Sequence, residues 1–246
     1  MTITRQQTTT GHRDGRDQVL VEPEWLQEHL HDPGLRIVEV DVSAAMYTAG
    51  HIQGAVLWNV YTDLKDGDYA TIDATAFTRL VRGCGIQPQS TVVLYGYAPA
   101  MGLWLLRLFG HHDVRILNCS RAEWIAVGGS LTAATPPIPA TEYVLRGRDD
   151  RIRADPAQVQ AAINDPRVTI VDVRSAAEWE TTALQEVFGD LDLSDDAPIL
   201  TYCTIGGRAS TAWFALTYLL GRTNVAVYDG SWAQWGRTPG APVARA

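Results

Sequence analysis

Cysteine is scarce in this sequence, and the few thiols form no metal-binding or disulfide pattern. The 246 residues include Cys84, Cys119 and Cys203, an odd number with no C-x-x-C spacing. A disulfide framework needs paired cysteines, and a structural zinc site needs closely spaced ligands. We therefore expect no metal and no cofactor. We also expect a cytoplasmic protein, because free thiols suit a reducing compartment.

Long apolar runs are also missing. Residues 213–220, one of the longest runs, fall far short of the roughly 20 residues that span a bilayer. Residues 1–17 are polar and lack the apolar stretch of a secretory signal. Nucleic acids and anionic membranes are normally bound by clustered Lys and Arg, whereas this chain has 28 acidic and 20 basic residues and a net charge of −8. The sequence predicts a soluble protein with a disordered tail over residues 1–17 and no nucleic-acid or membrane partner.

The two halves of the chain carry the same landmarks in the same order. In each half a β-branched run is followed by a helical stretch, a buried strand, an amphipathic helix ending at Gly, and a further strand, which is the alternation of a parallel α/β sheet. In both halves a Trp follows that Gly by 14 residues. The matched landmarks are Ile37-Val-Glu-Val-Asp-Val with Ile170-Val-Asp-Val, Thr91-Val-Val-Leu-Tyr with Pro198-Ile-Leu-Thr-Tyr, and Gly110 to Trp124 with Gly221 to Trp235.

A Pro-rich stretch over residues 135–139 separates the copies, since it can continue neither a helix nor a central strand. We therefore predict two α/β domains, residues 18–134 and 148–246, each a parallel sheet flanked by helices, joined by a linker over residues 135–147. A chain of this length accommodates two domains of about 100 to 130 residues.

The copies differ in two respects. The first copy has Gly96 at the position equivalent to Cys203. The second copy spans 30 residues from Asp172 to Tyr202, whereas the first spans 54 from Asp41 to Tyr95, so about 24 residues are missing (54 − 30 = 24). We expect a shortened second domain with a more open cleft beside Cys203, or, as the alternative, a first domain that fills the gap.

Cys203 lies where a strand, a glycine-containing loop and a helix follow one another. It comes directly after the strand predicted over residues 198–202, and Gly206 and Gly207 precede a helix expected to begin near Ala209. Glycines allow successive backbone N–H groups to turn inward, and the helix N-terminus adds partial positive charge. These donors stabilise a thiolate and an incoming oxyanion, so we predict a nucleophilic sulfur that needs no histidine partner.

A single free cysteine is more often a small buried apolar side chain than a nucleophile. We assign that structural role to Cys84, which ends a helical segment, and to Cys119, which lies near the end of a strand. Trp58, Trp104 and Trp232 are candidates for the walls of the cleft, with burial in the core as the alternative.

Three motifs in the second half resemble the rhodanese family, especially tandem-domain thiosulfate sulfurtransferases of actinobacterial type. They are Asp172-Val-Arg-Ser, Tyr202-Cys-Thr-Ile-Gly-Gly-Arg-Ala-Ser and Tyr228-Asp-Gly-Ser-Trp. Gly50-His-Ile-Gln-Gly-Ala in the first half fits the same family, with His51 as a structural landmark. The resemblance implies two rhodanese-like domains, the first of them catalytically silent, and a persulfide formed on the second domain at the domain interface.

The resemblance also implies a role for individual residues. Cys203 resembles the persulfide-forming nucleophile, and Arg174 matches an arginine that helps hold the anionic sulfur donor. The remaining substrate-binding positions form the loop itself, with two glycines as amide donors and a closing arginine: Thr204, Ile205, Gly206, Gly207 and Arg208.

The activity that the resemblance implies is transfer of sulfane sulfur from a small anionic donor, thiosulfate or a related compound, to cyanide, a thiol or a protein acceptor. Thr204 stands where thiosulfate-using members often carry Arg or Lys, so the donor stays open. One alternative is a persulfide relay or binding module that serves a protein partner, which Thr204 and the missing segment favour. Another is a phosphatase or arsenate-reductase-like enzyme, although the interval from Cys203 to Arg208 is one residue shorter than a phosphatase loop.

Overall fold

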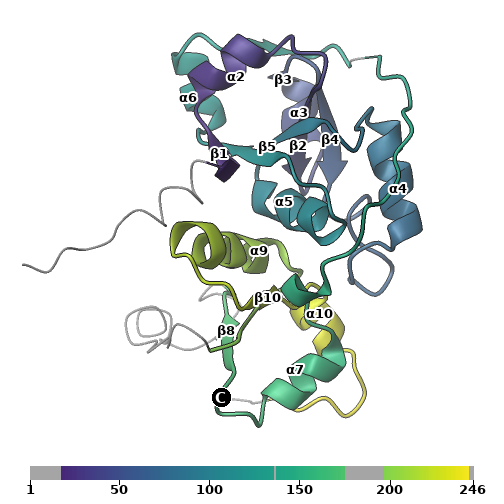
Figure 1. Cartoon of the computed structure of the whole chain (residues 1–246), viewed down its shortest axis with the longest axis vertical. Coiled ribbons are helices and arrows are strands. Elements are labelled where there is room, and N and C mark those ends of the chain that lie inside the picture. The colour runs from purple at the N-terminus through teal and green to yellow at the C-terminus, as the bar shows by residue number, and fades with distance from the viewer. Residues whose placement is uncertain (1–17, 136, 175–196, 244–246) are drawn as a thin grey trace, which may run out of the picture.

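The computed structural model describes residues 18–135, 137–174 and 197–243. It divides them between an N-terminal domain, in the upper part of Figure 1, and a C-terminal domain below it. Within the connecting segment, residues 133–149, the described residues form no helix or strand. The tail predicted over residues 1–17 lies outside the described residues, and the bounds of the predicted linker stay a prediction.

The N-terminal domain is built on a five-stranded sheet in which every pair of neighbours is parallel. Most residues of its inner strands are buried, which is typical of parallel strands covered on both faces. In sheet order the strands are β1 (Leu20–Val21), β6 (Val114–Leu117), β5 (Thr91–Gly96), β2 (Leu35–Asp41) and β4 (Ala55–Asn59).

Helices cover both faces of this sheet, and a short antiparallel pair flanks it. The helices are α2 (Pro23–His29), α3 (Ala45–Ala49), α4 (Ala74–Gly83), α5 (Pro99–Leu108) and α6 (Arg121–Ala126), and the pair is β3 (His51–Ile52) with β7 (Leu131–Thr132).

The C-terminal domain repeats the central part of this design. Its strands are parallel in the order β10 (Val225–Val227), β9 (Ile199–Tyr202) and β8 (Thr169–Asp172), which matches β6, β5 and β2 of the first domain. Trp124 in α6 and Trp235 in α10 are both buried, so the predicted repeat extends to its tryptophans. Its other described elements are η1 (Asp150–Ile152), α7 (Pro156–Ala162), α9 (Gly207–Phe214), η2 (Ala215–Leu219) and α10 (Ser231–Trp235).

Most of the segment that is shortened relative to the first copy, residues 175–196, lies outside the described residues. The helix after the cysteine begins at Gly207 rather than near Ala209. The earlier start is important for the site, because it brings the helix N-terminus within one residue of the loop glycine Gly206.

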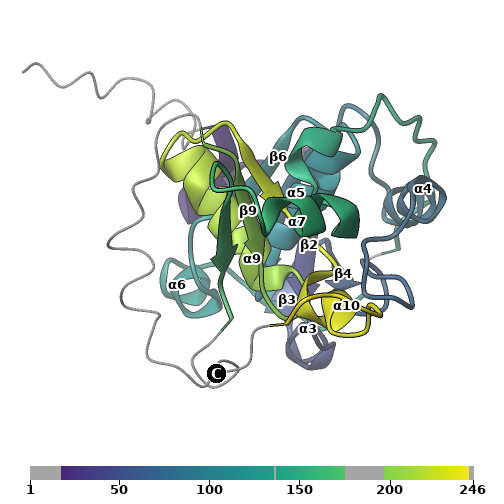
Figure 2. The ribbon, with the colours of Figure 1, turned by 90° about the horizontal axis from the view of Figure 1, so that it is seen from below.

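Alternate side chains of β9 point to opposite faces of the C-terminal sheet and pack into two different apolar clusters. Ile199 and Cys203 belong to an apolar cluster that also includes residues of α5 and α9, whereas Leu200 and Tyr202 pack against a second cluster formed with α7 and α10. Successive side chains of a strand point to opposite faces, so this pattern places α9 on one face and α7 with α10 on the other. In the view from below, α7 and α10 stand in front and α5 behind (Figure 2).

The apolar helix α5 joins the two domains. Its residues 100–106 and 108 are all buried, leaving Arg107 as the interruption. A helix that is apolar all round must be covered on every side. Accordingly, α5 packs against the first sheet on one side and against α9 on the other (Figure 1). One continuous core therefore holds both domains and fixes the position of the loop that leads into α9.

Candidate active site

The loop after β9 holds the sulfur of Cys203 against a backbone donor. Cys203 is only 1% exposed, and the N–H of Gly206 donates to its Sγ over 3.1 Å. Gly206 has φ +94°, and a Cβ at this position would lie 2.8 Å from the carbonyl oxygen of Asp229. Only glycine combines this left-handed backbone with so close an approach. The predicted glycine loop is therefore present and delivers an amide to the sulfur.

A second segment, residues 228–233, forms hydrogen bonds with the backbone of the Cys203 loop. The N–H of Cys203 donates to Ser231 Oγ over 3.1 Å, and this hydroxyl in turn donates to the carbonyl of Tyr228 over 2.8 Å. The carbonyls of Cys203 and Thr204 accept from the N–H groups of Trp232 and Ala233, at 3.0 and 2.9 Å. Ser231 adopts φ +51°, which is uncommon outside glycine. The Tyr-Asp-Gly-Ser-Trp motif thus holds the backbone of the loop in place through hydrogen bonds, a role that the sequence pattern did not reveal.

A cleft of about 380 Å³ between the domains opens onto this loop. The N-terminal domain supplies apolar and aromatic walls, and the loop supplies the floor. The lining residues are Val42, Val60, Tyr61, Tyr97 and Ala98 on one side and Cys203, Thr204, Ile205, Gly207 and Arg208 on the other. Of the two arrangements expected beside Cys203, the described residues favour the one in which the first domain fills the gap, because that domain lines the cleft and Cys203 is only 1% exposed.

Two arginines singled out in the sequence lie in different places. Arg208 lines the cleft, and its Nη2 donates to Thr204 Oγ1 over 3.0 Å. Arg174 is 6% exposed and is not among the residues that line the cleft. Its guanidinium pairs with Asp172 over 2.5 Å and lies 4.7 Å from the ring centroid of Trp232. The structure therefore brings Arg208 to the nucleophile's cleft and gives Arg174 a carboxylate partner beside it.

Lys65 is a neighbour of the loop that sequence reasoning missed. It belongs to the segment after β4 in the N-terminal domain and is 6% exposed. Its Nζ donates to the backbone carbonyl of Asp229 over 2.6 Å, and it would lie 3.2 Å from a Cβ placed on Gly206. Burial lowers the pKa of Lys65 to about 8. No local motif could have indicated this approach, because it depends on how the two domains pack.

Two segments of the chain, residues 22–127 and 155–238, match the Rhodanese-like domain. The chain belongs to the rhodanese family. It is 32% identical to the "Sulfur carrier protein TtuD" of Thermus thermophilus, covering 93% of this chain and 97% of that protein. It is 33% identical to a "Thiosulfate sulfurtransferase" of Corynebacterium glutamicum, over 91% of this chain and 89% of the relative. The predicted family and its tandem arrangement are confirmed.

Solved structures show the same fold. The structure of SseA from Escherichia coli, described as a 3-mercaptopyruvate sulfotransferase, aligns with a TM-score of 0.74 at 22% identity, over 87% of this chain and 98% of that one. An anaerobic ergothioneine biosynthesis enzyme from Chlorobium limicola aligns with a TM-score of 0.78 at 18% identity, over 92% of this chain and 70% of that one. Among the described residues of this rhodanese, no helix is long and apolar enough to cross a membrane.

The first rhodanese domain has a glycine at the position where the second has Cys203. Gly96 ends β5, which corresponds to β9, and it adopts φ +106°. A Cβ at this position would lie 2.9 Å from the carbonyl oxygen of Val40. The backbone of the first domain thus lacks room for any side chain at the position equivalent to Cys203.

Replacing Gly96 by Cys is expected to destabilise this rhodanese without creating a second active site. The left-handed backbone and the close carbonyl should cost about 1–3 kcal/mol of unfolding free energy. Thermal unfolding of Gly96→Cys measures the loss of stability. In a Cys203→Ser background the new cysteine should yield no thiocyanate from thiosulfate and cyanide, and restored turnover would contradict the assignment of the first domain as silent.

The other cysteines lie in structural surroundings. Cys84 Sγ accepts a hydrogen bond from Trp58 Nε1 over 3.2 Å, and burial raises the pKa of its thiol. Burial also raises the pKa of the Cys119 thiol. Both shifts favour the protonated thiol over the thiolate, and the structural role of these two cysteines stays a prediction.

The aromatic residues proposed as cleft walls lie elsewhere, and that expectation is corrected. Trp58 and Trp104 are fully buried in the core, and Trp104 donates to the carbonyl of Ile152 over 2.9 Å across the domain boundary. Trp232 faces Arg174. His51 is buried and its ring stacks on Tyr47 at 3.8 Å, and its structural role stays a prediction. The tyrosines Tyr61 and Tyr97 line the cleft in place of the tryptophans.

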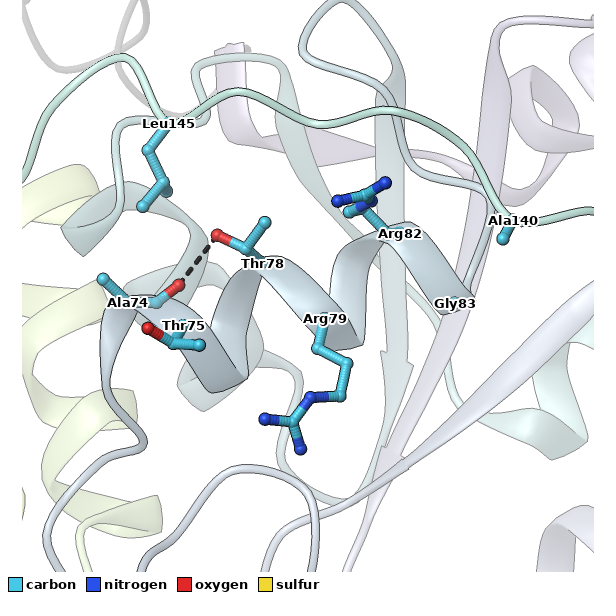
Figure 3. A pocket seen from close by; sticks show the side chains of 8 residues that line it. All are labelled: Ala74, Thr75, Thr78, Arg79, Arg82, Gly83, Ala140 and Leu145. Atoms are coloured by element: carbon cyan, nitrogen blue, oxygen red, sulfur yellow. Dashed lines mark hydrogen bonds between the residues drawn. The ribbon is translucent and has the colours of Figure 1, made fainter.

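A larger hollow of about 660 Å³ lies between α4 and the connecting segment. Figure 3 shows Leu145 reaching from that segment toward α4, while Arg79 points away from it. Arg82 donates to the carbonyl of Thr141 over 3.1 Å and pairs with Glu142 over 2.6 Å. None of the residues that line this hollow belongs to the Cys203 loop. The contacts of Arg82 hold the connecting segment against α4.

Proposed function

We propose that this rhodanese is a sulfurtransferase that takes sulfane sulfur from thiosulfate or a related anionic donor onto Cys203 and passes it to cyanide or a thiol. The observation that carries the proposal is the setting of Cys203. Its sulfur accepts the amide of Gly206 at the floor of a cleft that the two domains enclose. Backbone donors at a helix N-terminus favour a thiolate and also favour the charge on a persulfide.

The reaction proceeds in two displacements at sulfur. The Cys203 thiolate attacks the outer sulfur of thiosulfate, a new S–S bond forms to Cys203, and the S–S bond of thiosulfate breaks with the electron pair leaving on sulfite. The persulfide retains one negative charge. Cyanide then attacks the outer sulfur of the persulfide, thiocyanate leaves, and the Cys203 thiolate is regenerated. A thiolate acceptor attacks in the same way and leaves as a persulfide.

The walls of the cleft fit a small donor. The space of about 380 Å³ exceeds the size of thiosulfate, and Arg208 at its edge provides a cation for the sulfonate end. Arg174 lies next to the loop with Asp172, and Thr204, Ile205 and the two glycines complete the proposed binding surface. The relative in Corynebacterium glutamicum carries the name of this activity.

Intact-protein mass spectrometry tests the proposal directly. After incubation with thiosulfate and removal of the donor, a one-sulfur adduct of about 32 Da is expected on the peptide that contains Cys203. Subsequent cyanide should remove the adduct and release one equivalent of thiocyanate. If neither thiosulfate nor mercaptopyruvate produces an adduct on Cys203, the proposed function is wrong.

An arginine at position 204 should improve the use of thiosulfate. Thr204 lines the cleft, so a guanidinium there would add a charge-assisted contact to the sulfonate, worth on the order of 1.5–3 kcal/mol when well aimed. Because Arg208 is adjacent and of like charge, we expect the lower end, a fall in the KM for thiosulfate of about tenfold. Steady-state kinetics of Thr204→Arg measure it, with Thr204→Val as the uncharged control. An unchanged KM in Thr204→Arg would place the donor elsewhere in the cleft.

A relay role is the second candidate, and two observations favour it. Tyr97 is 71% exposed and Tyr61 48% exposed at the mouth of the cleft, where a protein acceptor could pack. The relative in Thermus thermophilus is named a sulfur carrier protein. A relay would accept sulfur quickly from a persulfide-bearing donor protein such as a cysteine desulfurase but turn over slowly on thiosulfate and cyanide. Comparing the two loading rates on Cys203 decides between the roles.

A further inference from the structure

Lys65 is the only lysine in the sequence. The chain has 20 basic residues of the Lys and Arg types, and all the others are arginines. This single ammonium group is buried, although lysine is almost never fully buried without a specific partner. It comes from the N-terminal domain and crosses to the C-terminal domain, where its Nζ contacts the carbonyl of Asp229 immediately behind Gly206. Gly206 is the residue whose amide donates to the sulfur of Cys203.

Among the described residues, Lys65 has no direct contact with a carboxylate, because the carboxylate of Asp229 is bound by other donors. The Asp229 carboxylate accepts from Arg153 Nε over 2.8 Å and from the N–H of Thr71 over 2.5 Å. Lys65 Nζ instead contacts the backbone carbonyl, which carries no net charge. A buried cation bound to a neutral oxygen projects its field through a region of low dielectric constant. Cys203 is one of the titratable groups whose charge acts on Lys65, and its sulfur accepts the amide of Gly206.

We propose that Lys65 is the fixed cation of the sulfur-transfer site, a positioning residue that the first domain inserts behind the Gly206 loop to stabilise the negative charge on the sulfur of Cys203. The inference rests on the proposed function, because that charge is carried by the thiolate before attack and by the persulfide after it. The inference also gives the first domain a part in the chemistry, because Lys65 supplies a positive charge that the neutral side chain of Thr204 in the loop does not supply.

If Lys65 only linked the two domains, its side chain would not need to be charged. Burial lowers the pKa of Lys65 to about 8, while the nearby Asp229, Cys203 and Asp66 raise it and Arg153 lowers it further. The net lowering means that the folded protein disfavours the protonated form, so the charge weakens the fold. A neutral donor would join the domains with less loss of stability. A compact ammonium places its charge at a single atom, and Lys65 Nζ lies 3.2 Å from where a Cβ of Gly206 would stand.

The charge is present only below a defined pH. Because the pKa of Lys65 is about 8, the ammonium persists at neutral pH and is lost as the pH rises through 8. Asp229 and Arg153 from the second domain, Asp66 from its own segment and Cys203 are the charged groups that face it. Support for the sulfur anion should therefore be nearly complete at neutral pH and below, fall by half near pH 8 and be absent well above it.

A single lysine allows a direct test by NMR. Full-length protein made with carbon-13 lysine gives one lysine side-chain signal, whose titration should have its midpoint near pH 8. Since coupling between two sites is reciprocal, removing the thiolate in Cys203→Ser should lower that midpoint by about 0.5–1 pH unit. Equal midpoints in the wild type and in Cys203→Ser would overturn the proposal and leave Lys65 as a structural contact.

Alkylation of Cys203 tests the same coupling from the other side. The rate of carbamidomethylation by iodoacetamide, followed on the Cys203 peptide, rises with pH as the thiolate forms. Lys65→Met and Lys65→Gln should both move the midpoint of this rise upward by about one pH unit, because both lack the charge although Gln keeps an N–H donor. Arg82→Met is the matched control, since it also removes a cation bound to a distant carbonyl, but at α4.

The outcomes separate this inference from the proposed function. If Lys65→Met and Lys65→Gln lower the thermal unfolding midpoint but leave the alkylation midpoint in place, Lys65 is only a tie between domains. If one of these variants fails to fold, the other variant and the NMR titration still test the coupling between Lys65 and Cys203. Neither measurement uses a sulfur donor. A wild-type protein that forms no persulfide would therefore refute the sulfurtransferase function, whereas the coupling between Lys65 and Cys203 would be judged by its own result.

Discussion

Cys203→Ser should abolish sulfur transfer, lowering thiocyanate formation from thiosulfate and cyanide by at least about 10³-fold. An alcohol is not ionised at neutral pH, so the stabilising amide of Gly206 would face a neutral hydroxyl that can neither attack thiosulfate nor carry the sulfur. The substitution is small and conserves the shape of a side chain that is 1% exposed, so the fold should be retained. Steady-state kinetics and the thermal unfolding midpoint measure both effects.

The other two cysteines are the matched controls. Cys84→Ser and Cys119→Ser should keep most of the activity, because neither thiol lies among the residues that line the cleft. Cys84→Ser should weaken the contact from Trp58 Nε1 and cost some stability. Thiocyanate formation at the wild-type rate by Cys203→Ser would refute the central assignment, whichever of the remaining thiols were responsible.

Gly206→Ala is expected to have the second largest effect, a loss of about 10²-fold in kcat/KM. The new Cβ would lie 2.8 Å from the carbonyl oxygen of Asp229 and 3.2 Å from Lys65 Nζ, on a backbone with φ +94°. The loop must shift to relieve both contacts, and the amide that donates to the sulfur shifts with it. Loss of one such donor typically costs 10² to 10³ in rate. Kinetics with thiosulfate and thermal unfolding measure the effects.

Gly128→Ala separates backbone strain from the loss of the donor. Gly128 has φ +90°, nearly the same as Gly206, but a Cβ there would meet nothing within 4 Å, and the residue follows α6 outside the site. Its replacement should lower stability by about 1 kcal/mol and leave kcat/KM unchanged. If Gly206→Ala and Gly128→Ala lose the same activity, the Gly206 amide has no part in the chemistry.

Much of the fold follows from local patterns, which the repeat makes visible. The β-branched runs at Ile37 and Ile170 became β2 and β8, and the two tryptophans at equal distance from a glycine became the buried anchors of α6 and α10. A strand followed by a glycine loop and a helix predicted where Cys203 would lie, since turn and cap preferences act over a few residues. The assignment of substrate-binding roles to Arg174 and to the loop residues remains a prediction.

Interactions between the domains escaped the sequence analysis. The missing segment of the second copy left two arrangements open, an exposed cleft or one filled by the first domain, and Val42 and Tyr97 of the first domain line the cleft. Two of the tryptophans expected at its walls, Trp58 and Trp104, instead belong to the core around α5, and Trp232 contacts Arg174. These outcomes depend on how two separately predictable domains dock, and docking is decided by shape and burial over a whole interface rather than by local periodicity.

By itself, the sequence determined the family, the two α/β domains and the one cysteine with the loop of a nucleophile, because hydrophobic period, glycine placement and motif spacing are local properties of the chain. Only the tertiary structure decided what surrounds that cysteine. It placed Ser231 beneath the loop and brought Lys65 from the other domain to the back of Gly206. Electrostatic fields act through space over distances set by packing, so the environment of Cys203 follows from the folded arrangement and not from the residues adjacent to it in the chain.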